Sequence, residues 1–124
     1  MSKTNILVVE DNMDTYELVR FVLERQGYQT FLAVNGLDGV SAAIKQIPDL
    51  IIMDLAMPEM DGWTATENIK REPTTKSIPL IALTARATPG ERARALASGC
   101  DEFLTKPIDL EELVETVNHW LNKP

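Results

Sequence analysis

The sequence predicts an α/β fold in which five strands alternate with five helices around a parallel sheet. Short apolar runs of strand type alternate along the chain with segments whose apolar residues recur at helical spacing. Several of these runs are apolar almost throughout, which is typical of strands buried on both faces of a sheet. No repeat, low-complexity tract or linker divides the 124 residues, so we expect a single domain over residues 1–124.

The first strand and helix are predicted between residues 6 and 27. Residues 6–9 form an apolar run typical of a buried strand. Residues 13–25 have a wide apolar face and stop at Gly27, a residue that commonly ends helices. Residues 28–34 form a second strand of more mixed composition. The residues expected on the apolar face of the first helix are Tyr16, Leu18, Val19, Phe21, Val22 and Leu23.

The middle of the chain predicts a helix, a strand and a further helix. Apolar residues at i, i+3, i+4 and i+7 indicate a helix that ends at Pro48. Residues 50–53 form a wholly apolar third strand, and a weaker pattern over residues 63–71 predicts the next helix. The apolar residues of the helix before Pro48 are Val40, Ala43, Ile44 and Ile47.

Two more strand and helix pairs are predicted in the last third. Residues 80–83 form the fourth strand, residues 91–98 an alanine-rich helix, and residues 103–105 a short fifth strand. Asp109 is the predicted N-cap of the last helix, with Glu112 as its reciprocal partner in a capping box. The apolar stripe of that helix comprises Leu110, Leu113, Val114, Val117 and Leu121.

Composition excludes several functional classes. The formal net charge of −7 disfavours nonspecific nucleic-acid binding, which depends on lysine and arginine at phosphates. One cysteine, Cys100, cannot form an internal disulfide, which indicates a reducing compartment. No apolar run reaches the length of a membrane span, and the N-terminal segment lacks the pattern of a signal peptide. We therefore expect a cytoplasmic protein that binds neither nucleic acid nor membranes.

Residues able to do chemistry follow four of the five predicted strands. In an open parallel sheet, ligands bind beyond the carboxyl ends of the strands. A strand order of 2-1-3-4-5 places these four strands side by side and leaves the second, which ends without such a residue, at the edge. The residues are Glu10 and Asp11 after the first strand, Asp54 after the third, Thr84 and Ala85 after the fourth, and Lys106 and Pro107 after the fifth.

Three converging carboxylates predict a metal site. They repel one another, and a divalent cation relieves that repulsion. Mg²⁺ fits because it takes oxygen ligands and commonly binds one or two carboxylates together with a phosphate oxygen. We expect Asp11 and Asp54 as direct ligands and Glu10 as a ligand through water. Asp54 would then be a nucleophile that carries a phosphoryl group. Its charge would be stabilised by Mg²⁺, Lys106 and Thr84.

These segments together resemble the receiver domain of two-component response regulators. The quoted segments are VVEDN at 8–12, IIMDLAMPEMDG at 51–62, LTA at 83–85 and TKP at 105–107. The likeness covers essentially the whole chain in motif order and spacing. It implies the flavodoxin-like fold, with the same strand order of 2-1-3-4-5.

The resemblance also implies a role for each site residue. Asp54 is expected to be the phosphoacceptor. Glu10 and Asp11 are expected to hold Mg²⁺, together with the backbone carbonyl of Ala56. Thr84, beside Ala85, matches a hydroxyl that moves toward the phosphoryl group.

Three further positions near the last strand match the family pattern. Lys106 matches the lysine that pairs with the phosphoryl group, and Phe103 matches an aromatic residue whose rotamer follows Thr84. The bond between Lys106 and Pro107 is expected to be cis. Phe103 departs from the frequent tyrosine and lacks its hydroxyl. Ala56 and Arg86 occupy two positions that border the phosphoryl group and that vary in the family.

The expected function is that of a stand-alone, single-domain response regulator. A histidine kinase or a histidine phosphotransfer protein donates the phosphoryl group, and no turnover of an external substrate is expected. The surface of the fourth helix, fifth strand and fifth helix then changes its affinity for a downstream protein. Whether phosphorylation also makes a dimer stays open at this point. Arg86, Arg92 and Arg94 form a basic cluster, which we expect to consist of solvated helix charges.

Two other functions share these residues. A Mg²⁺-dependent phosphatase with an aspartyl-phosphate intermediate would use the same nucleophile, but it would want an acid at position 56 to protonate a leaving group. An interaction module that works without phosphorylation would normally have lost an acid, the lysine or the hydroxyl. Alone, Asp54 would be an ordinary loop residue, and its convergence with the other four side chains is what favours the receiver.

Overall fold

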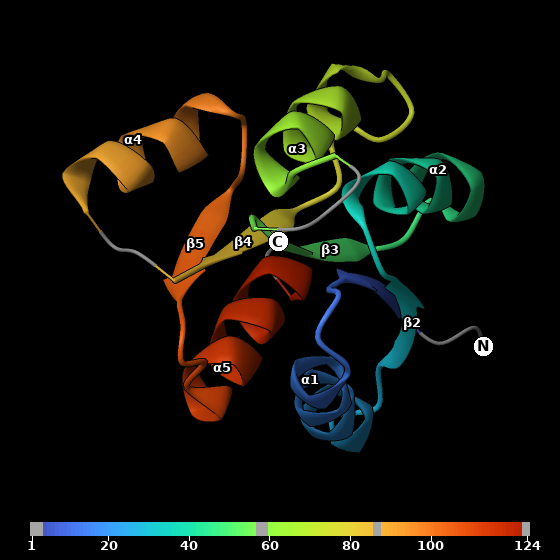
Figure 1. Cartoon of the computed structure of the whole chain (residues 1–124). Coiled ribbons are helices and arrows are strands. Elements are labelled where there is room, and N and C mark those ends of the chain that lie inside the picture. Colours follow the sequence, from blue (N-terminus) through green and yellow to red (C-terminus); the bar gives the residue numbers. More distant parts are fainter. Residues whose placement is uncertain (1–3, 57–59, 86–87, 123–124) are drawn as a thin grey trace.

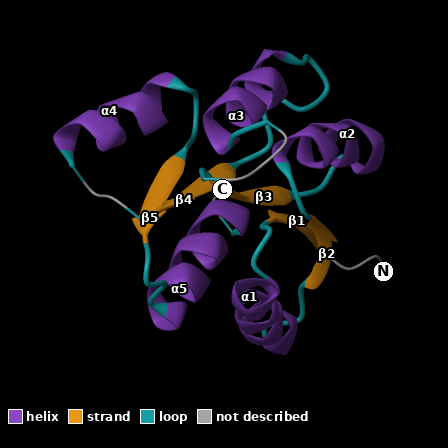
Figure 2. Cartoon of the chain, viewed as in Figure 1, coloured by secondary structure: helices purple, strands orange, loops and turns teal. Residues whose placement is uncertain are grey.

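A computed structural model describes residues 4–56, 60–85 and 88–122 of the chain. In this part of the chain, five strands and five helices alternate strictly, and the sheet lies between two layers of helices (Figures 1 and 2). The elements are β1 (Asn5–Val9), α1 (Met13–Arg25), β2 (Gln29–Ala33), α2 (Gly36–Gln46), β3 (Leu50–Asp54), α3 (Gly62–Arg71), β4 (Leu80–Thr84), α4 (Pro89–Ala97), β5 (Glu102–Thr105) and α5 (Leu110–Leu121).

The sheet has the predicted topology. Its strand order is β2-β1-β3-β4-β5, and every neighbouring pair is parallel. Helices α1 and α5 cover one face, and α2, α3 and α4 cover the other (Figure 1). This is the flavodoxin-like arrangement, in which the carboxyl ends of the strands share one edge.

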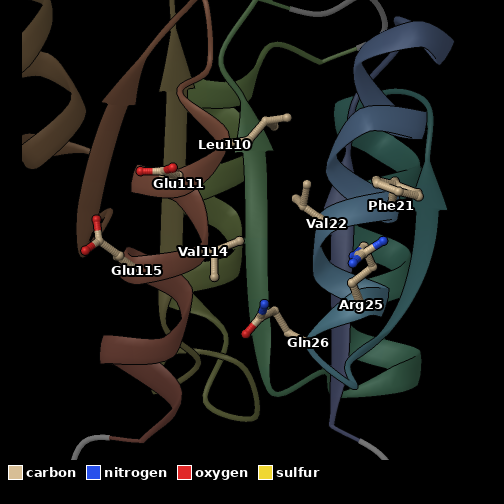
Figure 3. Close-up of a pocket in the computed structure, with 8 residues that line it drawn as sticks. All are labelled: Phe21, Val22, Arg25, Gln26, Leu110, Glu111, Val114 and Glu115. Atoms are coloured by element: carbon tan, nitrogen blue, oxygen red, sulfur yellow. The ribbon is translucent and has the colours of Figure 1, made fainter.

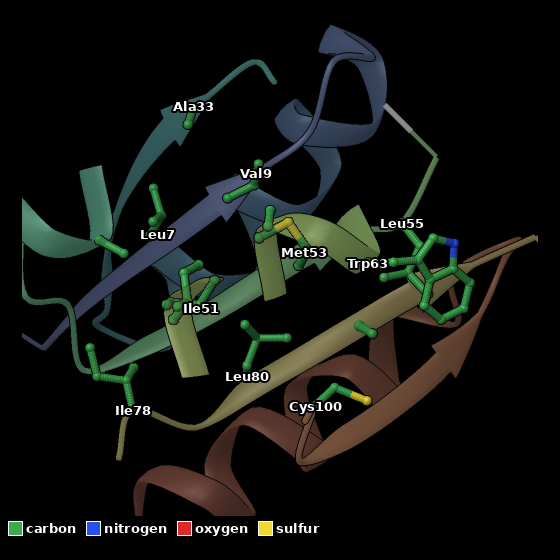
Figure 4. Packing of buried hydrophobic residues seen from close by; sticks show 14 of the residues in the cluster. Leu7, Val9, Ala33, Ile51, Met53, Leu55, Trp63, Ile78, Leu80 and Cys100 are labelled. Atoms are coloured by element: carbon green, nitrogen blue, oxygen red, sulfur yellow. The ribbon is translucent and has the colours of Figure 1, made fainter. Parts of the chain in front are cut away.

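Two apolar clusters, one on each face of the sheet, form the core. Side chains alternate between the faces along a strand, so Leu7 and Val9 join one cluster while Ile6 and Val8 join the other. Figure 4 shows the first cluster, in which Trp63 of α3 packs near the end of β3. Strands β3 and β4 are buried along their whole length, as the apolar runs of residues 50–53 and 80–83 predict.

Each of the five helices in the described chain begins with a side-chain cap. Asn12 accepts a hydrogen bond from the Thr15 amide at 3.0 Å, and Asp109 accepts one from the Glu112 amide at 3.1 Å. The reciprocal bond of a capping box, from the Glu112 side chain, is absent among the described residues. The remaining caps are Asn35, Asp61 and Thr88. No helix within the described ranges is long and apolar enough to cross a bilayer.

The apolar face predicted for α1 is wrong in part. Leu18 and Phe21 are 55% and 60% exposed, and the helix reaches the core through Tyr16, Val19 and Leu23. A face of six residues is wider than the stripe that one helix can bury against a sheet. The two outer residues are therefore left at the surface.

Helices α2 and α4 also differ from the prediction. Ile44 and Ile47 are exposed, because α2 packs on the sheet through small residues. A Cβ added to Gly39 would lie 2.9 Å from a methyl group of Val9, which shows how closely α2 approaches β1. Helix α4 begins at Pro89, two residues before the predicted start, because Thr88 caps it and proline is favourable in a first turn.

Candidate functional site

The side chains predicted to carry chemistry converge at the carboxyl edge of the sheet. Asp54 and Thr84 are the last residues of β3 and β4, while Glu10 and Lys106 directly follow β1 and β5. The register brings these ends level, since Asp54 pairs with Leu83 on the neighbouring strand. The topology thus gathers residues that are up to 96 positions apart in the sequence.

Glu10, Asp11 and Asp54 form a compact acidic cluster. Each offers one carboxylate oxygen, and these oxygens all lie within 4.8 Å of one another. Glu10 and Asp54 are 1% and 3% exposed, whereas Asp11 is open to solvent. Oxygen donors that converge in this way, with one side open to water, fit a hard divalent cation. This arrangement fits the metal site predicted from the sequence.

Lys106 is the cation of the site. Its Nζ lies 3.2 Å from Asp54 Oδ2 and 3.5 Å from Glu10 Oε1. The backbone amide of Lys106 donates to the Thr84 carbonyl at 2.7 Å, which fixes the start of this segment against β4. One ammonium group faces three carboxylates, so the site keeps an excess of negative charge that attracts a metal ion.

Burial makes Glu10 hard to ionise. Desolvation, a hydrogen bond with Asp54 and the charge of Asp54 raise the pKa of Glu10 from 4.5 to about 7. The Asn12 amide donates to Glu10 Oε2 at 3.1 Å, and this bond and Lys106 favour the charged form. Their combined effect is smaller than the cost of burial, so Glu10 titrates near neutral pH.

The backbone after β3 fixes the orientation of Asp54. The Ala56 amide donates to Asp54 Oδ1 at 3.2 Å, while the Leu55 amide donates to the Leu83 carbonyl at 3.0 Å. The Gly62 amide then donates to the Leu55 carbonyl at 3.0 Å and brings the start of α3 against the end of β3.

Gly62 is a site residue that the sequence analysis missed. A Cβ at this position would collide with the Asp54 carbonyl oxygen and with the Cα of Leu55. Only glycine allows this close approach. The signal in the sequence was the glycine at position 62, directly before the helix predicted over residues 63–71.

A hollow of about 220 Å³ lies between the ends of β3 and β4. Thr84 and Ala85 border it, as the prediction placed them beside the phosphoryl group, and Thr84 is buried. Two residues that the sequence analysis did not assign to the site, Trp63 of α3 and Glu91 of α4, also line it. The hollow therefore extends from the end of β4 to helices α3 and α4.

Two arginines of α4 lie over aromatic rings. The Arg92 guanidinium lies 5.1 Å from the centre of the Phe103 ring, and the Arg94 guanidinium lies 4.4 Å from that of Trp63. Both arginines are exposed, as expected of solvated helix charges, and each also lies over an aromatic ring. Arg86, the third arginine of that prediction, falls outside the described residues.

The peptide bond between Lys106 and Pro107 is cis, as predicted. Phe103 is half-buried on β5, one strand away from Thr84. The structure thus brings the predicted acids, lysine and hydroxyl to one edge of the sheet and places the aromatic residue beside them. The chemical roles assigned to these residues stay predictions at this point.

Comparison with known proteins gives a consistent result. A family model described as the response regulator receiver domain matches residues 6–118. The chain is 36% identical over 117 residues to the polar-differentiation response regulator DivK of Brucella anthropi, covering 94% of this chain and 95% of that protein. It is 46% identical over 118 residues to hybrid signal transduction histidine kinase G of Dictyostelium discoideum, of which it spans only 3%.

Solved structures agree with the sequence relatives. The chain superposes with a TM-score of 0.91 on the receiver domain of a sensor histidine kinase from Pseudomonas aeruginosa PAO1, at 34% identity. The match covers 98% of this chain and 100% of that one. That structure is described with a magnesium ion coordinated in its active site cleft.

Proposed function

This chain belongs to the response regulator receiver domains of two-component systems, and from this membership we propose that Asp54 accepts a phosphoryl group and thereby switches a protein-interaction surface. The donor is a histidine kinase or a histidine phosphotransfer protein. The observation that carries the proposal is the position of Asp54. It is a buried carboxylate at the end of β3, 3.2 Å from Lys106 Nζ and inside an acidic cluster that fits a metal ion.

Phosphoryl transfer needs an oriented nucleophile and a surrounding that stabilises negative charge. Asp54 attacks the phosphorus atom of the donor, a bond from phosphorus to a carboxylate oxygen forms, and the bond from phosphorus to the donor imidazole breaks. The Ala56 amide and the Lys106 ammonium hold the two oxygens of the Asp54 carboxylate before attack. After transfer, the Lys106 ammonium faces the negative charge of the phosphoryl group on Asp54.

Magnesium is the proposed cofactor. Glu10, Asp11, Asp54 and the backbone carbonyl of Ala56 would hold Mg²⁺, which would supply positive charge beside the transferred group. Glu10 contributes through a water molecule and holds its proton until the pH approaches 7 or a cation arrives. Thr84, at the end of the neighbouring strand, supplies a hydroxyl donor for a phosphoryl oxygen.

The switch that we propose runs from Thr84 to the face formed by α4, β5 and α5. Movement of Thr84 toward the phosphoryl group makes room for Phe103, which lies under Arg92 of α4. A change in the Phe103 rotamer therefore disturbs a contact that holds α4. The downstream protein responds because its affinities for the two arrangements differ.

We also propose that the protein is not a phosphatase acting on external substrates. A phosphatase needs an acid near the nucleophile to protonate a leaving group, and position 56 is alanine. An interaction module without phosphorylation is disfavoured because the acids, Lys106 and Thr84 are all retained at one edge of the sheet.

Intact-mass spectrometry after incubation with acetyl phosphate tests the proposal. We expect one added phosphoryl group on the wild type with Mg²⁺, and none without Mg²⁺ or in Asp54→Asn. Asp49→Asn is the matched control, because Asp49 is an exposed aspartate at the other end of β3 and should label normally. Labelling that persists in Asp54→Asn would overturn the assignment, and the absence of labelling under every condition would favour an interaction module.

A further inference from the structure

Helix α2 carries an apolar strip on its solvent side. The helix packs inward through small residues, among them Gly39 and Ala43, whereas Leu37 and Ile44 are 51% and 43% exposed. At 3.6 residues per turn, Leu37, Ser41 and Ile44 lie within about 60° of one another around the helix axis. Ser41, between the two apolar side chains, is exposed as well. These three residues define the α2 strip.

No described helix covers the α2 strip. Helix α2 is the outermost helix of its layer, with α3 on one side and no further described helix on the other (Figure 1). A groove of about 450 Å³ between α1 and α5 lies on the opposite face of the sheet (Figure 3). The α2 strip is therefore separate from that groove. Exposed apolar surface of this kind commonly marks a protein-protein contact.

The spacing within the strip is that of a helix that packs against another helix. Leu37, Ser41 and Ile44 fall at i, i+4 and i+7, the alternation that forms the seam between two paired helices. The small Ser41 leaves room for a large side chain of the opposite helix, because large and small residues interdigitate across such a seam. The strip therefore fits a helical partner.

The charges beside the strip indicate which helix that partner is. Asp38 and Lys45 flank the same side of the strip, near the start and the end of α2. Both are exposed, and neither forms an ion pair within the described part of the chain. In an antiparallel pair of identical helices, the start of each helix lies beside the end of the other. Asp38 of each copy then meets Lys45 of the other, and Ser41 of each meets Ile44 of the other.

We propose that the α2 strip binds the same strip of a second copy of this chain, antiparallel and about a two-fold axis. An acidic partner helix would oppose Asp38 with like charge, and a basic one would do the same to Lys45, whereas a second copy satisfies both. The proposal goes beyond phosphoryl transfer and does not rest on it, because no residue of the strip belongs to the phosphorylation site.

The size of the strip sets the strength of this contact. At about 1.5 Å per residue, α2 is roughly 16 Å long, and a helix is about 10 Å wide. One helix per copy thus offers roughly 160 Å², well below the roughly 800 Å² that each partner contributes to a standard stable interface. The association is therefore weak and short-lived. A chemical crosslinker suits it, because the crosslinked product accumulates.

Crosslinking of Ser41→Cys with a short bismaleimide tests the proposal on the full, unphosphorylated chain. Ser41 lies near the two-fold axis, so one reagent molecule can reach both introduced thiols. Gln46→Cys is the matched control, because Gln46 is exposed on another side of α2. After each rate is divided by that of a monofunctional maleimide, we expect Ser41→Cys to crosslink about tenfold faster than Gln46→Cys. Cys100 is buried and should not react.

Charge reversal tests the pairing of Asp38 with Lys45. In the Ser41→Cys background, Asp38→Lys and Lys45→Glu should each slow crosslinking about five- to tenfold, because like charges then meet twice. An equimolar mixture of the two variants should crosslink again, because both ion pairs are restored, and intact-mass spectrometry should show mixed dimers. Arg71→Glu, an equal charge change to Lys45→Glu at an exposed position of α3, should leave the rate unchanged.

Three results would overturn the proposal. Equal rates for Ser41→Cys and Gln46→Cys would leave the strip to a different protein. Crosslinking that both charge variants retain, or that does not recover on mixing, would rule out the antiparallel pairing. Circular dichroism and urea unfolding establish that each variant is folded. Labelling at Asp54 should be unchanged in all of them, so failure of this contact is distinguishable from failure of the phosphorylation site.

Discussion

The buried carboxylate of Glu10 should make the protein less stable as the pH rises. In the folded state this group is fully buried beside Asp54, and its pKa is raised to about 7 from 4.5. The folded protein therefore binds the proton more tightly than the unfolded chain does. The stabilisation from this proton is fully present below pH 4.5 and is lost as the pH rises through 7.

The structure sets an upper limit on this effect. Each pH unit between the two pKa values corresponds to about 1.4 kcal/mol, so keeping Glu10 ionised above pH 7 costs at most roughly 3 kcal/mol. Replacement by glutamine keeps the shape of the side chain and its acceptor for the Asn12 amide, but removes the charge. Without Mg²⁺, Glu10→Gln should be more stable than the wild type by about 1 to 3 kcal/mol at pH 8 and nearly equal to it at pH 4.5.

Urea unfolding at a series of pH values measures this difference. Glu67→Gln, at an exposed position on α3, is the control and should show no such pH dependence. Added MgCl₂ should stabilise the wild type at pH 8 and stabilise Glu10→Gln less, because one negative charge is missing from the cluster. A stability difference between Glu10→Gln and the wild type that is the same at pH 5 and pH 8 would refute the reasoning, since desolvation of a charge cannot then be its cause.

Three further predictions concern packing around the site and in the core. Gly62→Ala should lower the free energy of unfolding by about 1 to 3 kcal/mol and slow labelling by acetyl phosphate, because its Cβ collides with the backbone at the end of β3, whereas Gly90→Ala, with open space around its Cβ, should be neutral or stabilising. Cys100 is buried and its pKa is raised to about 11, so a thiol reagent at pH 8 should modify it only after unfolding. Arg94→Ala should cost about 1 kcal/mol in urea unfolding and make Trp63 more accessible to a fluorescence quencher, and unchanged quenching would contradict the contact.

Much of the fold could be predicted because apolar runs and helix caps are local signals. The order of elements followed from the alternation of strands and helices, whereas the strand order rested on the placement of the reactive residues and on the resemblance to receiver domains. The buried faces of α1 and α2 could not be predicted fully. Leu18, Phe21, Ile44 and Ile47 have apolar side chains at helical spacing, but their burial depends on how closely each helix approaches the sheet. That distance is set by small residues such as Gly39, whose importance appears only in the packed structure.

The part of the site that could be predicted consists of residues at or directly after the ends of the strands. Asp54, Thr84 and Lys106 could be placed together because parallel strands end at a common edge. Gly62 and Trp63 were missed because their roles depend on the position of α3 against that edge. The contacts of Arg92 and Arg94 were missed for a related reason, since no pattern within α4 indicates which rings lie beneath it.

The wide sequence separation within the acidic cluster has a consequence for folding kinetics. Glu10 and Asp54 meet only after β1 and β3 have paired, and Lys106 reaches them only after β5 has joined the sheet. Contacts between such distant segments form late. Repulsion between the carboxylates is thus a property of the finished molecule and is largely missing from the folding transition state. A cation that neutralises the cluster should therefore slow unfolding and leave the folding rate almost unchanged. Metal binding would lengthen the lifetime of the native state without helping the chain to reach it.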